Sequence, residues 1–160
     1  MNTADVLVRI DGEVESPASF TFPDLLDIDG QHQIADVSSI APKRVGGAVT
    51  LDGLLARVNV TAQAKYIGLH ASRDDFHASV PLDAIRERAI VIYRREDSPL
   101  SVNEGGPVRL FIPDHAACHV AEIDECANVK FIDHIELTVE RGFDNRPQDD
   151  EEHEKLHADE

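Results

Sequence analysis

The sequence predicts an α+β domain built on a mixed, β-rich sheet with short helices. Segments with strand-like alternation recur along most of the chain, whereas the helical patterns extend over only one or two turns. A doubly wound fold is not indicated, because such a fold needs long helices between its strands. A length of 160 residues suits a single hydrophobic core and therefore one domain.

The first quarter of the chain holds two strand-like segments and a short helix. Residues 6–10 are strand-like in composition, and Asp11-Gly12 is a strong turn signal after them. Thr21 is placed to cap a short helix whose residues Leu25-Leu26 turn inward. Residues 34–40 again have strand-like composition, so a second strand is expected there.

The clearest helix follows Thr50, a residue type that caps helices well. Leu51, Leu54, Leu55 and Val58 fall at positions i, i+3, i+4 and i+7. They therefore form one apolar stripe that faces the core.

The second half of the chain is richer in strands. Residues 65–71 and 135–139 alternate between apolar and polar side chains, which indicates strands with one wet face. Residues 89–93 are continuously apolar and predict a strand buried on both faces. Residues 82–85 follow Pro81 and are expected to form a helical turn.

Charge and composition limit the function classes. The net charge is −16, which argues against a nucleic-acid partner because a phosphate polymer needs a basic surface. The N-terminal residues lack a secretory signal, and no apolar run is long enough to cross a membrane. We therefore expect a cytoplasmic protein, in which Cys118 and Cys126 are free thiols.

Residues 144–160 lose the apolar periodicity. They contain eight acidic residues against two basic ones, a net charge of −6. Such a segment cannot bury enough apolar surface to fold. We therefore divide the chain into a domain of residues 1–143 and an acidic, disordered tail of residues 144–160.

The most informative stretch is Asn103-Glu104-Gly105-Gly106-Pro107-Val108-Arg109-Leu110-Phe111-Ile112-Pro113. It is typical of a glycine turn that leads into a strand. Arg109 lies on the face opposite the alternating apolar residues, directly after the turn. A cation beside two glycine N–H groups is suited to bind an anion. The alternative is a simple hairpin turn with a solvated arginine.

This stretch and its neighbours resemble the molybdopterin-binding domain of the sulfite oxidase family. Ser98-Pro99-Leu100, the glycine-glycine-proline turn, the arginine-bearing strand, Val129-Lys130-Phe131-Ile132 and Ile135-Glu136-Leu137 come in the order and spacing of that family. Weaker matches upstream are Lys65-Tyr66-Ile67-Gly68-Leu69, Asp74-Asp75-Phe76 and Val80-Pro81-Leu82. The resemblance covers roughly residues 4 to 141 and implies the family fold.

The resemblance also implies a cofactor site with one departure from the family pattern. In that family a cysteine thiolate binds molybdenum, and the matching position here is Ser39, or Ser38 with a shift of one residue. Either a hydroxyl replaces the thiolate, or the protein does not ligate the metal. The alternative is that both are ordinary polar residues at a strand end.

The remaining family contacts hold molybdopterin and its phosphate. The resemblance assigns these contacts to Glu104, Gly105, Gly106, Arg109 and Lys130. Arginine binds phosphate in a bidentate manner, whereas lysine acts as a point charge. The alternative for Arg109 is a salt bridge with Glu104 or with a neighbouring residue.

The loop of residues 114–126 is acidic where the family loop is basic. It contains His115, Cys118, His119 and Cys126, whose side chains are zinc-ligand types. The seven-residue spacing between the cysteines does not match a zinc knuckle. We therefore expect no tightly bound zinc in this loop.

These observations favour a molybdopterin-dependent oxidoreductase-like domain that binds molybdenum cofactor for oxygen-atom or electron transfer. It would act on a small-molecule substrate with a redox partner, and not on nucleic acid or at a membrane. The alternative is a binding or interaction module on the same fold that has lost the cofactor. Ser39 is the residue on which the two hypotheses differ.

Overall fold

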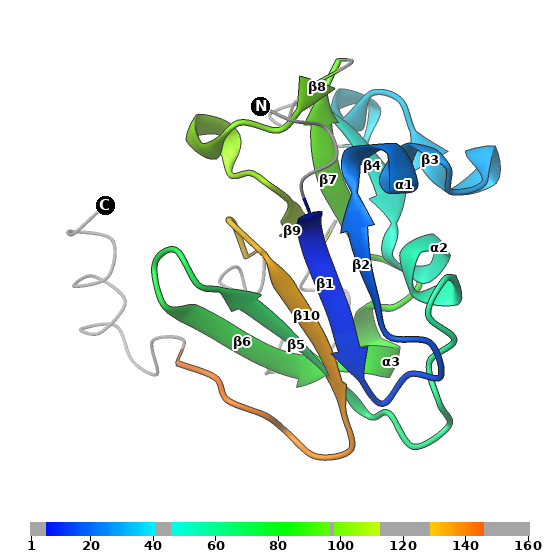
Figure 1. Ribbon diagram of the computed structural model, residues 1–160, viewed down its shortest axis with the longest axis vertical. Helices are drawn as coiled ribbons and strands as arrows, with labels where there is room; N and C mark the ends of the chain where they lie inside the picture. The colour runs from blue at the N-terminus through cyan, green and yellow to red at the C-terminus, as the bar shows by residue number, and fades with distance from the viewer. Residues whose placement is uncertain (1–5, 41–45, 97, 113–128, 146–160) are drawn as a thin grey trace.

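The computed structural model describes residues 6–40, 46–96, 98–112 and 129–145, which form two sheets with short helices beside them (Figure 1). The strands are β1 (Val6–Gly12), β2 (Ala18–Thr21), β3 (Gln33–Ile34), β4 (Gly47–Thr50), β5 (Tyr66–Ala71), β6 (Phe76–Pro81), β7 (Ile90–Arg95), β8 (Ser98–Pro99), β9 (Arg109–Phe111) and β10 (His134–Thr138). The α-helices are α1 (Phe22–Leu26), α2 (Leu51–Ala56) and α3 (Leu82–Ile85), and the 3-10 turns are η1 (Gly30–His32), η2 (Val37–Ser39) and η3 (Val102–Glu104).

The two sheets have different strand pairings. The first has the order β2-β1-β10-β5-β6, in which β1 and β10 pair in parallel and the other pairs are antiparallel. The second has the order β3-β4-β7-β8, with β9 also paired to β7, and is antiparallel throughout. This β-rich, mixed architecture with short helices confirms the predicted fold class.

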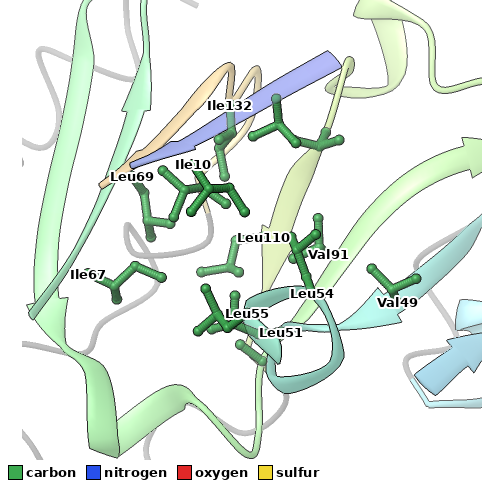
Figure 2. Close-up of a cluster of buried hydrophobic side chains, with 14 of the residues drawn as sticks. Ile10, Val49, Leu51, Leu54, Leu55, Ile67, Leu69, Val91, Leu110 and Ile132 are labelled. Atoms are coloured by element: carbon green, nitrogen blue, oxygen red, sulfur yellow. The ribbon is translucent and has the colours of Figure 1, made fainter. Parts of the chain in front are cut away.

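The main core fills the space between the two sheets and is closed by α2 (Figure 2). Ile10, Ile67 and Leu69 come from the first sheet, whereas Val49, Val91 and Leu110 come from the second. As the sequence predicts, Thr50 caps α2, and its Oγ1 accepts a hydrogen bond from the Gly53 amide at 3.1 Å. The apolar stripe of α2, including Leu51, Leu54 and Leu55, is fully buried.

Strand β7 is buried on both faces, as its continuous apolar run predicts. Val91 and Tyr93 point into the main core, whereas Ile90 and Ile92 point into a smaller cluster on the other face. That cluster also contains Val37, Ala48 and Leu100. The functional-site residues described below lie around this second face.

Two local predictions are wrong. Residues 34–40 do not form one strand, because β3 ends at Ile34 and η2 follows. Asp36 accepts a hydrogen bond from the Ser38 amide, and this cap favours a helical turn over an extended strand. Leu26 was expected to face inward but is exposed, because Phe22 and Leu25 fill the one buried face of this single-turn helix.

Candidate functional site

The glycine turn has no free backbone donors. The amide of Gly105 donates to the Val102 carbonyl at 3.0 Å, and the amide of Gly106 donates to the Ser101 carbonyl at 2.8 Å. Both bonds close the turn that η3 begins. Neither glycine amide is therefore free to donate to an anion in this structure, and the predicted contact of this turn with a cofactor stays a prediction.

The two glycines are needed for different reasons. Gly105 has φ of +98°, a conformation that side-chain-bearing residues rarely adopt. A Cβ on Gly106 would collide with the backbone carbonyl of Leu100 and would lie 2.9 Å from the Ser101 oxygen. Gly106 therefore allows two chain segments to pack together, and its role is structural.

Arg109 and Lys130 converge over Gly105. A Cβ on Gly105 would lie 3.1 Å from Arg109 Cδ, 3.2 Å from Arg109 Nη1 and 3.3 Å from Lys130 Cγ. The Phe131 amide donates to the Gly105 carbonyl at 2.8 Å, which brings Lys130 to the turn from a distant part of the sequence. We call Arg109 and Lys130 the basic pair.

Glu104 orients the cations around this turn. Its backbone carbonyl accepts a hydrogen bond from Arg109 Nη1 at 3.1 Å. Its carboxylate forms an ion pair with Arg95 at 3.0 Å and accepts a hydrogen bond from the Ser101 hydroxyl at 2.9 Å. Both carboxylate oxygens of Glu104 therefore have partners within the protein, and its predicted cofactor contact stays a prediction.

The two serines of η2 are both bonded to Asp36. The Ser38 hydroxyl donates to Asp36 Oδ1 at 2.6 Å, and the Ser39 hydroxyl donates to the Asp36 carbonyl at 2.7 Å. The Ser38 hydroxyl and then the Ser38 amide hold the pKa of the Asp36 carboxyl below its ordinary value. These bonds close a capped turn.

The serine turn and Arg109 lie on opposite sides of β7 in the second sheet. The Val37 amide donates to the Gly46 carbonyl at 2.9 Å, so η2 is attached beside the start of β4. Ala48, Ile92 and Arg109 are successive partners across β4, β7 and β9. Two strand spacings, about 10 Å, therefore separate the backbone of Ala48 from that of Arg109. The sheet thus connects the two predicted parts of the site.

The structure adds Arg94, which the sequence analysis missed. A Cβ on Gly47 would lie 2.6 Å from both Cζ and Nε of Arg94, so the guanidinium lies against this glycine. Arg94 Nη1 donates to the Glu96 carbonyl at 3.0 Å, whereas Nε is buried and has no hydrogen-bond partner among the described residues. The paired Gly46-Gly47 was a signal for such a close approach.

The described ranges contain neither a metal-binding cluster nor a membrane-spanning helix. Among them, no group of three or more His, Cys, Asp or Glu side chains is arranged to hold a metal ion. Cys118, Cys126 and the rest of the acidic loop lie outside these ranges, so the absence of zinc there stays a prediction. No helix in the same ranges is long and apolar enough to cross a membrane.

The sequence profile of the oxidoreductase molybdopterin-binding domain matches residues 1–145. The chain therefore belongs to this family, and the predicted resemblance is confirmed. Among solved structures, it is similar to the sulfane dehydrogenase SoxCD from Paracoccus pantotrophus, with a TM-score of 0.61 and 18% sequence identity. The match covers 88% of this chain but 40% of the SoxCD chain, and it shows a shared fold. No curated protein sequence matches the chain.

Proposed function

We propose that this domain binds a molybdopterin cofactor through the basic pair, with Arg109 and Lys130 contacting the cofactor phosphate. The observation that carries this proposal is that the side chains of both basic residues pass close to Gly105, which has no side chain to fill the space. A guanidinium forms directional bonds to phosphate, and an ammonium adds a mobile point charge. Family membership supports a pterin as the source of that phosphate.

The residues fit the two ends of such a cofactor differently. The phosphate end is matched by the basic pair and by Arg94 against Gly47. The metal end is not matched by a thiolate, because Ser39 stands at that position and its hydroxyl donates to Asp36. When bound, the cofactor would supply oxygen-atom or electron transfer. The role of this chain is then to bind and orient it, and we assign Ser39 no metal bond.

The second candidate is a binding module on the same fold that has lost the cofactor. The observation that favours it is the closed turn at Ser38 and Ser39, whose hydroxyls are both used within the turn. In this case the basic pair would bind another small anion. For the first candidate we propose a small-molecule substrate and a redox partner in the cytoplasm. The strongly acidic composition supports a small molecule over nucleic acid, because a phosphate polymer needs a basic surface.

The test expresses the full chain in cells that make molybdenum cofactor and measures released pterin by fluorescence and molybdenum by elemental analysis. We expect pterin in the wild type and about tenfold to hundredfold weaker binding in Arg109→Ala, since a charge-assisted bond contributes about 1.5–3 kcal/mol. Arg88→Ala is the matched control, because Arg88 is an exposed arginine outside the site. Absence of pterin from the wild type would favour the second candidate.

Ser39→Cys tests the metal end separately. If the turn lies at the metal position, a thiolate there should raise molybdenum occupancy above that of the wild type. Ser38→Cys is the control for the one-residue shift. Pterin binding without any gain of metal in either variant would keep the cofactor proposal but reject η2 as the metal position.

A further inference from the structure

Three histidines form a row on the face of the first sheet that points away from the main core. His70 of β5 lies directly opposite His77 of β6 and His134 of β10 in the strand register. The ring centroids are 5.0 Å apart for His70 and His77, and 5.1 Å apart for His70 and His134. The flanking residues Leu69 and Ala71 point into the core, which fixes the histidine row on the other face.

His70 and His77 contact each other through like atoms. Their Nδ1 atoms are 2.8 Å apart, which is a hydrogen-bond distance. At the far side of each ring, Nε2 faces a carboxylate: His70 faces Glu136 at 3.1 Å, and His77 faces Asp75 at 2.8 Å. The result is a continuous chain of contacts from Asp75 through both rings to Glu136.

A count of protons determines the charge of this pair. An ionised carboxylate only accepts hydrogen bonds, so each Nε2 must carry a proton. The contact between the two Nδ1 atoms needs one further proton, because two bare nitrogens would repel each other. Three protons on two imidazoles give one positive charge. Two protons would leave one contact without a hydrogen, and four would set two N–H groups head to head.

The surroundings indicate which ring is neutral. Burial is the largest influence on His70 and lowers its pKa, the Glu136 hydrogen bond opposes this, and the charges of His134 and His77 lower it further. His70 is therefore the ring that accepts at Nδ1, and His77 is the ring that donates both to His70 and to Asp75. The other titratable and charged groups around the row are Asp11, which contacts His134, and Asp133, Arg141 and Asp144 on the adjoining segments.

Residues 141–145, which we call the strap, run along the open edge of β6 beside this pair. The Gly142 amide donates to Ser79 Oγ at 2.9 Å, and Asp144 Oδ2 accepts from the Ser79 amide at 2.9 Å. The His77 amide donates to Asn145 Oδ1 at 2.7 Å, and the Asn145 amide donates to the His77 carbonyl at 2.9 Å. The Phe143 ring packs edge-on against the His77 ring with centroids 4.8 Å apart. Movement of the His77 ring therefore acts on the strap through its contact with Phe143.

We propose that His70 and His77 share one proton as an imidazole–imidazolium pair, and that this pair is a proton-operated latch that holds the strap on β6. A second proton places two N–H groups against each other across 2.8 Å, so the rings must separate. The His77 ring then moves against Phe143, and the strap is released from the edge strand. The latch lies on the first sheet, whereas the proposed cofactor contacts lie around the second, so it is independent of the proposed function.

The direct test uses the full-length wild type labelled with ¹⁵N. An N–H···N bond transmits a scalar coupling between the two nitrogens, and we expect this coupling between His70 Nδ1 and His77 Nδ1 at neutral pH. It should disappear as the pH falls and the second proton binds. The resonances are assigned from His70→Gln and His77→Gln. His134→Gln is the matched control, because His134 belongs to the row but not to the shared bond. The coupling between His70 and His77 should persist in this variant.

The consequence for the strap is tested by hydrogen exchange of the Asn145 amide, expressed as a protection factor to remove the intrinsic effect of pH. Losing a hydrogen-bonded contact should lower protection by about tenfold on acidification in the wild type and in His134→Gln. In His77→Gln the pH dependence should be absent. No N–N coupling in the wild type, or the same pH dependence in His77→Gln, would overturn the proposal.

Discussion

Replacing each glycine of the turn by alanine should destabilise the domain to very different extents. Gly105→Ala keeps the turn but places a side chain at φ of +98°, which costs about 1–2 kcal/mol. The three atoms nearest to its Cβ are side-chain atoms of Arg109 and Lys130, at 3.1 to 3.3 Å, and these can move aside. Gly106→Ala instead drives a methyl group into the Leu100 backbone carbonyl, which has no room to move. We expect a loss of at least about 3 kcal/mol.

The assay is urea unfolding followed by circular dichroism, with anion binding measured on the variants that fold. Gly105→Ala should remain folded and weaken binding, because the methyl group occupies the space between the two cations. Gly106→Ala should lose stability first. The structural reasoning is refuted if both variants are equally stable, or if Gly105→Ala binds the cofactor as tightly as the wild type.

Three further predictions test other contacts. Thr50→Ala removes the acceptor for the Gly53 amide at the start of α2 and should cost about 0.5–2 kcal/mol in urea unfolding. Tyr93→Phe leaves the Gln33 side-chain oxygen without the hydroxyl that donates to it at 2.8 Å, and should cost about 1–3 kcal/mol by the same assay. His70 has a pKa below 6.5, so the unfolded chain binds more protons between the lowered value and 6.5. Stability should therefore rise with pH across that window, and His70→Gln should flatten the rise.

The sequence predicted the elements whose signals are local. Thr50 and the apolar spacing of α2 describe a helix completely, because a cap and one buried face are enough to define it. The burial of β7 on both faces was also predicted from a local signal, the continuous apolar run of this strand. The predicted strand over residues 34–40 is wrong because Asp36 accepts hydrogen bonds from the Ser38 amide and hydroxyl. That local competition outweighs β-branched composition.

The site was predicted only in part, because its geometry depends on contacts between distant segments. Arg109 and Lys130 were named from a family pattern, and the structure brings both to Gly105. The use of both glycine amides inside the turn could not be predicted, since it depends on how Ser101 and Val102 fold back. Asp144 and Asn145 form hydrogen bonds with β6. The predicted domain limit at residue 143 stays a prediction. Residues 146–160 of the predicted tail lie outside the described ranges.

The separation between the serine turn and the basic pair explains why family membership alone does not decide the chemistry. Arg109 is on β9, whereas Ser39 belongs to a turn attached beside β4, on the far side of β7. In the proposed function, different segments would therefore contact the two ends of the cofactor. A substitution at one end leaves the backbone of the other in place, so a chain can keep phosphate contacts after losing a metal ligand. Pterin and molybdenum must for this reason be measured separately, because each reports on one end of the site.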